Sequence, residues 1–237
     1  QIEHLLMPSM SESSDWRNAL EGCDVVIHLA ARVHVMHEDS EDPLSEFRKT
    51  NVALTTNFAR QAAALGVKRF IFLSSVKAVS DNPNGILFED VEPNPLTHYG
   101  KSKLLAEQYI LSKEIPEGKR VYILRPCMIH GPGNKGNLNL LYKLASKGIP
   151  WPLGAFENKR SFCSIDNLMF IIKELIERED IPSGVYNVAD DEALSTNDVI
   201  SILAESQNKK PKIWNFSKGL IKALAKLGDV FRLPRCN

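Results

Sequence analysis

Three continuous apolar segments, separated by helix-like patterns, most constrain the fold of this chain. They run from Cys23 to Ala31, from Val67 to Ser75 and from Arg120 to Pro126. A strand buried on both faces needs such a continuous run, whereas a strand with one wet face alternates. Helical spacing between the segments predicts helices over 43–66 and 99–115. The alternation therefore predicts an α/β fold with a doubly wound parallel sheet.

Beyond Gly133 the sequence changes character, with a loop rich in Gly and Asn followed by a proline-rich turn. The patterns that follow predict a short helix over 139–147, a helix over 166–179, a strand over 184–189 and a helix capped by Ser195 or Thr196. We therefore expect two domains. Residues 1–133 would form most of the sheet, and residues 134–237 mainly a smaller substrate-binding lid, with some segments returning to the sheet.

Composition excludes several classes of partner. Lys and Arg together number 29, Asp and Glu also number 29, and no basic run occurs, so nucleic acid is not an expected partner. No stretch of about 18 apolar residues is present, so we expect no membrane insertion. The four cysteines have neither the spacing of metal ligands nor the density of a disulfide scaffold. We therefore expect no metal and a location in the reducing cytoplasm.

Tyr99 and Lys103 lie four residues apart in a predicted helix, and the strand before that helix ends in Ser74 and Ser75. Side chains at i and i+4 share a helix face, so the Lys103 ammonium should lie near the phenol and favour its ionised form. Lowering a phenol pKa from about 10 to neutrality corresponds to roughly 4 kcal/mol. We expect Tyr99 to be a general acid/base, with a strand-end hydroxyl holding the substrate oxygen.

Several residues allow a structural as well as a chemical interpretation. Tyr109 and Lys113 repeat the Tyr-x-x-x-Lys spacing, but roughly 1000° of helical rotation turns Tyr109 off the face of Tyr99, so we interpret it as a packed tyrosine. Ser75 could instead cap the next turn. Cys127 is more simply a small packing residue than a reactive thiol. A polar segment is interpreted as a surface loop rather than a metal site, although it contains His34, His37, Glu38 and Asp39.

Five ordered motifs carry a resemblance to a known family. They are HLAA at 28–31, Asn51 in TNVALT, FIFLSS at 70–75, YGKSK at 99–103 and RPCMIHGPG at 125–133. On these motifs the chain resembles the extended short-chain dehydrogenase/reductase family, and within it the nucleotide-sugar 4-epimerases and 4-ketoreductases that act on UDP-N-acetylhexosamine derivatives. The resemblance implies a Rossmann-like cofactor domain, NAD or alternatively NADP as cofactor, a UDP-sugar as substrate, and a homodimer.

The same resemblance implies a role for each site residue. Ser75 would orient the 4-oxygen of the sugar, Tyr99 would be the general acid/base, and Lys103 would bind the nicotinamide ribose. The cofactor would be lined by Leu29, Ala30, Ala31, Asn51, Ser74, Tyr99, Lys103 and Pro126. The substrate would contact Ser75, Met128, Asn137, Pro152, Leu153 and Arg160. The planar guanidinium of Arg160 suits phosphate oxygens, the alternative being a solvated surface charge.

The residues after Ser75 bear on the type of reaction. A sugar-nucleotide 4,6-dehydratase commonly has an Asp-Glu pair there, whereas this chain has Val76 and Lys77, so dehydration is disfavoured. The sequence indicates an NAD-dependent 4-epimerase of a UDP-hexose or UDP-N-acetylhexosamine that works through a 4-keto intermediate. Two alternatives stay open: an NAD(P)H-dependent 4-ketoreductase of a UDP-4-keto-6-deoxy-hexosamine, and a non-catalytic cofactor-binding fragment.

One motif of the family does not occur. The family begins with a strand and a Gly-rich turn that receives the cofactor pyrophosphate, and the sequence opens at Gln1 without such a turn. We therefore expect a fragment that lacks roughly the first two βα units. The residue that distinguishes NAD from NADP would lie in that part.

Overall fold

The computed structural model of residues 1–237 describes the chain except for residues 1–3, 7–9, 34–41, 134–137, 220 and 222–237. The chain forms two compact units. The first comprises residues 1–127 and 166–189, and the second comprises residues 128–165 and 190–237. The chain thus leaves the first unit before the expected boundary at residue 133.

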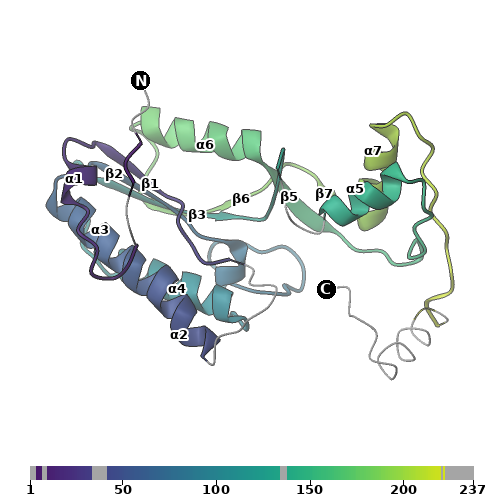
Figure 1. Ribbon diagram of the computed structural model, residues 1–237, viewed down its shortest axis with the longest axis horizontal. Helices are drawn as coiled ribbons and strands as arrows, with labels where there is room; N and C mark the ends of the chain where they lie inside the picture. The colour runs from purple at the N-terminus through teal and green to yellow at the C-terminus, as the bar shows by residue number, and fades with distance from the viewer. Residues whose placement is uncertain (1–3, 7–9, 34–41, 134–137, 220, 222–237) are drawn as a thin grey trace. The chain divides into compact units, whose positions relative to one another are not determined.

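The first unit is built on a four-stranded parallel sheet, as the sequence predicted (Figure 1). In spatial order its strands are β1 (Val25–His28), β2 (Arg69–Leu73), β3 (Arg120–Pro126) and β6 (Gly184–Val188). One face of the sheet carries α2 (Pro43–Phe47), α3 (Leu54–Ala64) and α4 (His98–Leu111), and the other carries α6 (Ile165–Glu177). The short α1 (Arg17–Leu20) packs beside α3. Helices on both faces of parallel strands define the doubly wound α/β class.

Burial on both faces explains the continuous apolar strands. Ile71 and Phe72 of β2 and Ile123 and Leu124 of β3 are all fully buried, although neighbours on a strand point to opposite faces. Each such side chain contributes about 1.5–3 kcal/mol relative to an exposed one. The core of the first unit therefore lies along β2 and β3.

The helix predicted over 43–66 forms, but it is not uniform. α2 passes into a π-helical segment, η1 (Arg48–Ala53), before α3 begins. Asp42 caps α2 by accepting a hydrogen bond from the Ser45 amide (3.1 Å), and Pro43 occupies the start of the helix. A π-helical turn widens a helix locally and frequently lies at a functional site.

The helix predicted over 99–115 is shorter than expected, because α4 ends at Leu111. Ser112 follows, and its hydroxyl donates to the Tyr109 carbonyl oxygen (2.7 Å). A serine that binds the preceding turn in this way competes with continuation of the helix. The sequence-based prediction used Pro116 as the stop and so placed the end too late.

The second unit contains a three-stranded sheet that the sequence did not predict. β4 (Met128–His130) pairs in parallel with β5 (Arg160–Ser164), which pairs antiparallel with β7 (Ala193–Leu194). These strands are too short for apolar periodicity to indicate them. The unit also contains α5 (Leu138–Ser146) packed on α7 (Thr196–Glu205). Ser195 rather than Thr196 caps α7, since its Oγ accepts a hydrogen bond from the Asp198 amide (3.0 Å).

The described residues contain no helix that could span a membrane, no metal-binding cluster and no disulfide. Among the described residues, no helix is long and apolar enough to cross a membrane. Within the same residues, no group of three or more His, Cys, Asp or Glu side chains is arranged to hold a metal ion. Within the described part of the chain, Cys23, Cys127 and Cys163 form no disulfide. The segment containing His34, His37, Glu38 and Asp39 lies outside the described residues, as does Cys236.

His28, the last residue of β1, is buried among aromatic rings and only 4% exposed. Its Nε2 lies 2.8 Å from the Thr55 hydroxyl oxygen on α3. Its ring stacks on Phe72 with 5.6 Å between centroids. Burial, assisted by the positive charge of Lys103, lowers the pKa of His28 to about 4. The imidazole is therefore neutral at neutral pH.

We expect His28 to make the fold sensitive to acid. The unfolded chain takes up this proton near pH 6.5 and the folded chain only near pH 4, so stability falls as the pH drops through that window. The shift corresponds to a loss of about 3 kcal/mol. Urea unfolding between pH 7 and pH 4 should give a shallower decline for the His28→Gln chain than for the native chain. Parallel declines would contradict this prediction.

Candidate active site

The start of α4 is fixed by a cap and by a carboxylate from a distant loop. Thr97 accepts a hydrogen bond from the Gly100 amide through its Oγ1 (3.1 Å). Asp81 accepts hydrogen bonds from the amides of Leu96 (2.7 Å) and Thr97 (3.0 Å) and from the Thr97 hydroxyl (2.9 Å). Although partial burial raises the pKa of Asp81, these hydrogen bonds lower it overall. The carboxylate stays ionised and holds the first turn of α4 in place.

Gly100 lets this turn approach the strand tip. After β2, the chain forms a 3₁₀ turn, η2 (Val76–Ala78), and a Cβ at position 100 would collide with the Lys77 carbonyl oxygen within it. The same Cβ would lie 2.9 Å from the Cβ of Pro95. The absence of a side chain therefore allows α4 to pack directly on the turn that follows Ser75. This close approach brings Tyr99 to Ser75.

Ser75 and Tyr99 lie close enough for the serine side chain to favour the ionised form of the phenol. Ser75 also caps η2, because its Oγ accepts a hydrogen bond from the Lys77 amide (3.2 Å). The structural interpretation of this serine is therefore confirmed, and its chemical role stays a prediction.

The electrostatics of Tyr99 differ from the expectation. Burial raises the pKa of Tyr99 above its ordinary value, and the hydrogen bond with Ser75 only partly opposes this effect. The expectation that Lys103 lowers this pKa towards neutrality is wrong for the protein's own groups. The Lys103 ammonium binds the Leu73 carbonyl oxygen instead. The spacing of residues along a helix also does not reveal how strongly burial desolvates the Tyr99 phenol.

Lys103 is almost completely buried, with 2% of its surface exposed. Its Nζ donates to the Leu73 carbonyl oxygen at the end of β2 (2.7 Å) and lies 4.5 Å from the centroid of the Phe72 ring. Burial lowers the pKa of Lys103 to about 8, while the nearby Glu107 carboxylate raises it. The ammonium is therefore largely protonated at neutral pH and is held at the strand tip.

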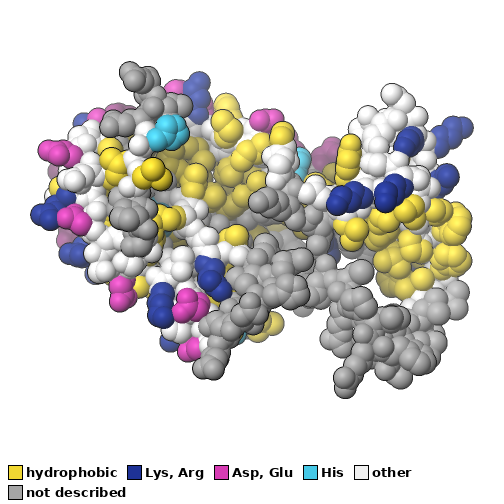
Figure 2. All heavy atoms as spheres, viewed as in Figure 1, with side chains coloured by type: hydrophobic (Ala, Val, Ile, Leu, Met, Phe, Trp, Pro, Cys, Tyr) yellow, Lys and Arg dark blue, Asp and Glu magenta, His cyan; other side chains and the backbone are white. Residues whose placement is uncertain are grey.

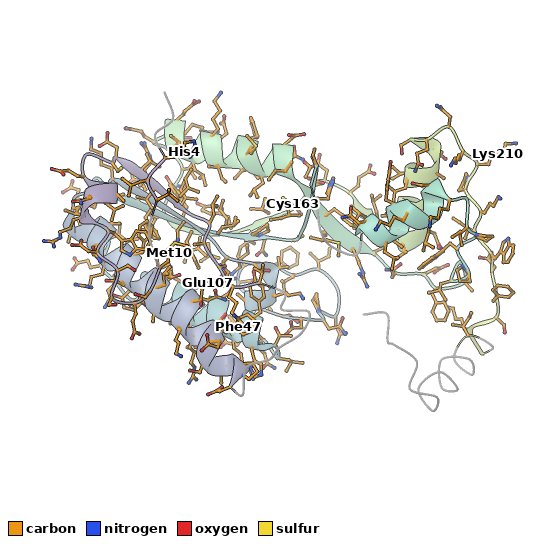
Figure 3. The ribbon with its side chains drawn as sticks, in the orientation of Figure 1. His4, Met10, Phe47, Glu107, Cys163 and Lys210 are labelled. Carbon is orange, nitrogen blue, oxygen red and sulfur yellow. The ribbon has the colours of Figure 1, made fainter. Side chains whose placement is uncertain are left out.

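Sequence reasoning missed a buried ionic group between α4 and the sheet. Glu107, labelled in Figure 3, is 1% exposed and pairs with Arg125 of β3, which is 4% exposed. The closest contact joins Arg125 Nη2 to Glu107 Oε2 at 2.6 Å. The Ser74 hydroxyl donates to the same carboxylate. Glu107 lies one helical turn beyond Lys103, a spacing that could have indicated it.

Asn51 links three parts of the first unit from within η1. It is 1% exposed, and its Oδ1 accepts a hydrogen bond from the Arg32 amide (2.7 Å). Its Nδ2 donates to the Arg32 carbonyl oxygen (3.0 Å) and to the Ser102 hydroxyl oxygen (2.9 Å). The Ser102 hydroxyl in turn donates to the Tyr99 carbonyl oxygen (2.7 Å). Asn51 therefore ties the segment after β1 to the turn of α4 that carries Tyr99.

The other expected cofactor residues lie at the carboxyl ends of the strands, where parallel sheets bind ligands. Leu29, Ala30 and Ala31 follow β1, and Leu29 is 57% exposed. A hollow of about 260 Å³ opens beside them and is lined partly by His28, Leu29 and Ala30. Hydrophobic side chains gather over the sheet beside α6 in Figure 2. Pro126 ends β3 and is buried.

The expected substrate residues that the structure describes belong to the second unit. Met128 and Arg160 line one small hollow, together with Phe162 of β5. Pro152 and Leu153 lie in a turn, and Leu153 forms an isolated antiparallel bridge with Asn215. Asn137 lies outside the described residues. The second unit therefore brings the methionine and the arginine together.

Tyr109 is not part of this site. It is partly buried against the core of the first unit, and the Lys113 ammonium lies 4.7 Å from its ring centroid. The interpretation of Tyr109 as a packed helix tyrosine is confirmed.

A parallel α/β sheet with a serine, a tyrosine and a lysine at its strand tips defines a protein of the short-chain dehydrogenase/reductase type. The model of the NAD dependent epimerase/dehydratase family matches residues 4–189, and the chain belongs to this family.

Known proteins agree with this assignment. The chain is 38% identical over 203 residues to a UDP-glucose 4-epimerase of Vibrio cholerae, covering 84% of this chain and 62% of that protein. It is 32% identical over 214 residues to an N-acetyl-alpha-D-glucosaminyl-diphospho-ditrans,octacis-undecaprenol 4-epimerase of Escherichia coli O157:H7, covering 86% and 62%. The solved structure of MoeE5 in complex with UDP-glucuronic acid and NAD has a TM-score of 0.70 at 27% identity, covering 85% of this chain and 68% of that one. The chain spans less than two thirds of the length of either curated relative.

The site geometry predicts an alkaline titration for Tyr99. Because burial raises its pKa, the phenol should ionise above the ordinary value of about 10, and the Ser75→Ala variant should titrate at a still higher pH. The Tyr99 signal can be isolated as the ultraviolet difference titration between the native and Tyr99→Phe chains. Ionisation near neutrality in the chain by itself would refute the predicted direction.

Proposed function

We propose that the protein is an NAD-dependent 4-epimerase of a UDP-hexose or UDP-N-acetylhexosamine. The observation that carries this proposal is the proximity of the Ser75 and Tyr99 side chains, with the Lys103 ammonium one helical turn away at the same strand tip. A hydroxyl that holds an oxygen, a phenol that exchanges its proton and a fixed cation are the groups needed to interconvert an alcohol and a ketone. The two 4-epimerases among the relatives support the same reaction.

The chain's own residues would divide the reaction between them. Ser75 orients the sugar 4-oxygen, and Tyr99 removes the 4-hydroxyl proton as hydride leaves C4. Tyr99 then returns the proton after the 4-keto sugar has turned over and received the hydride on its other face. Since burial favours the neutral phenol, Tyr99 is well suited to donate this proton. Proton abstraction requires the ionised form of Tyr99, which the Ser75 side chain favours.

The residues beyond β1 and on α4 fit the nicotinamide half of NAD. Leu29 is exposed, Ala30 and Ala31 are small, and Lys103 supplies a cation at the end of β2 in the same unit. NAD would supply an acceptor for the hydride and return it within the same turnover. The side chains of Asn51 and Ser74 form hydrogen bonds within the protein. These two residues would therefore shape the cofactor site by holding its walls in place. Pro126 would close it at the end of β3.

In the second unit we propose a diphosphate and sugar site at Met128 and Arg160, with Pro152 and Leu153 beside the uracil and Asn137 contributing to the nucleotide. Arg160 is exposed at the start of β5 and lines the same hollow as Met128. Its planar guanidinium matches phosphate oxygens. One relative acts on a UDP-sugar and another on a sugar diphosphate carried by undecaprenol, so both substrates share the diphosphate.

Domain organisation, assembly and location are also proposals. The first unit would bind the cofactor and the second mainly the substrate. The protein would act as a homodimer, as the family resemblance implies. A cytoplasmic location is supported by Cys23, Cys127 and Cys163, which form no disulfide in the described part of the chain and so suit a reducing compartment.

Tyr99→Phe should abolish conversion in the intact protein while leaving nucleotide-sugar binding nearly unchanged, because the ring stays and only the transferable proton is removed. The expected loss in kcat is on the order of 10² to 10⁴. Tyr109→Phe is the matched control, since Tyr109 is on the same helix but packs against the core. Rate and calorimetric binding measurements on both variants test this. Loss of activity in Tyr109→Phe with full activity in Tyr99→Phe would reverse the assignment.

The reaction type is tested with two substrates. The intact protein should convert UDP-N-acetylglucosamine to its C4 epimer with catalytic NAD, because an epimerase regenerates its cofactor in each turnover. A 4-ketoreductase would instead consume NADH or NADPH stoichiometrically with a UDP-4-keto-6-deoxy-hexosamine. Chromatography of the sugars and absorbance of the reduced cofactor distinguish the two. A parallel assay with an undecaprenyl-diphosphate-linked N-acetylglucosamine shows whether UDP is the required carrier.

A further inference from the structure

The stability of the fold does not by itself explain the buried ion pair of Glu107 and Arg125. Besides the 2.6 Å contact, Arg125 Nε lies 3.1 Å and 3.2 Å from the two carboxylate oxygens of Glu107. Charges buried this deeply lose their hydration, so a pair of this kind contributes little net stability compared with apolar residues of similar size. Arg125 Nη1 has no hydrogen-bond partner among the described residues. The pair is therefore better explained by what it holds in place.

The Glu107 carboxylate joins α4 to both central strands. Arg125 extends from β3, and the Ser74 hydroxyl reaches the same carboxylate from the end of β2. The Ser74 amide donates to the Leu124 carbonyl oxygen (2.7 Å), which fixes the two strand ends against each other. Glu107 thus contacts the residue immediately before the catalytic Ser75.

Lys103 is attached to the same strand end. Its ammonium binds the carbonyl oxygen of Leu73, the residue before Ser74, and it lies one turn from Glu107 on α4. The titratable and charged groups around it are His28 from β1, Tyr99 and Glu107 from α4, and Arg125 from β3. Of these, Glu107 is the one that favours the charged form of Lys103.

We propose that Glu107 is a positioning residue for the catalytic pair. Held by Arg125 and Ser74, its carboxylate locks α4 onto the tips of β2 and β3, and this fixes the Lys103 ammonium and the Tyr99 phenol relative to Ser75. The inference rests on the proposed function for its effect on turnover, but its effect on Lys103 is independent of any reaction.

The first test measures Lys103 directly in the chain itself. The ¹³Cε resonance of Lys103, assigned by comparison with Lys103→Arg, should titrate near pH 8 in the native chain. In Glu107→Gln, which keeps the shape of the side chain but removes its charge, the midpoint should fall by about one pH unit. Glu174→Gln is the matched control, because Glu174 forms an ion pair with Arg178 on the solvent side of the first unit. An unchanged midpoint in Glu107→Gln would overturn the proposal.

A double variant separates positioning from simple stability. Glu107→Gln leaves Arg125 charged and unpaired, which destabilises the fold, whereas Glu107→Gln with Arg125→Met removes both charges of this ion pair. The double variant should recover much of the free energy of unfolding, yet Lys103 should still titrate below its native midpoint. Recovery of both stability and the native midpoint would show a purely structural role and refute the proposal.

Turnover of the intact protein gives the second readout. Both variants should lower kcat roughly 10- to 100-fold with little change in KM, since a small displacement of the reacting groups is enough for such a loss. The alkaline limb of the kcat profile should move to lower pH together with the Lys103 midpoint. Native kcat in the double variant would overturn the proposal. Failure of the Tyr99→Phe prediction would instead remove the proposed function and leave the Lys103 titration as an independent result.

Discussion

The chemistry of the first unit depends on how closely α4 lies against the ends of β2 and β3. Gly100 permits the approach, because any side chain there would collide with the carbonyl of Lys77. Lys103 binds the carbonyl of Leu73, and Glu107 holds Arg125 across the same gap. The helix dictates only the spacing of these residues along α4. The strand ends supply the carbonyl, hydroxyl and guanidinium groups that bind Lys103 and Glu107 and so hold the helix in place.

Burial has opposite consequences for the two titratable members of the site. It raises the pKa of Tyr99 because the phenolate is the charged form, and it lowers the pKa of Lys103 because the ammonium is the charged form. Both effects favour neutral groups. Hydrogen bonding from Ser75 opposes the first, and the Glu107 carboxylate opposes the second. Polar groups that counteract desolvation therefore set the protonation of the site, and removing either group should shift the pKa of its partner further from the ordinary value.

The relatives differ in the carrier of the sugar more than in the reaction. A UDP-glucose 4-epimerase and an undecaprenyl-diphosphate-linked sugar 4-epimerase both match most of this chain. Ser75, Tyr99 and Lys103 belong to the first unit, whereas Met128 and Arg160 belong to the second. Under the proposed function, the proton transfer would belong to the first unit and the choice of substrate mainly to the second.

The sequence by itself determined the parallel α/β fold and singled out Ser75, Tyr99 and Lys103, because a buried parallel strand and an i, i+4 pair leave a periodic pattern. It did not reveal the sheet β4-β5-β7, whose strands are too short for periodicity. Only the tertiary structure decided the direction of the Tyr99 pKa and the partnership of Glu107 with Arg125. Desolvation and ion pairing depend on groups brought together from distant parts of the chain, and local spacing carries no record of them.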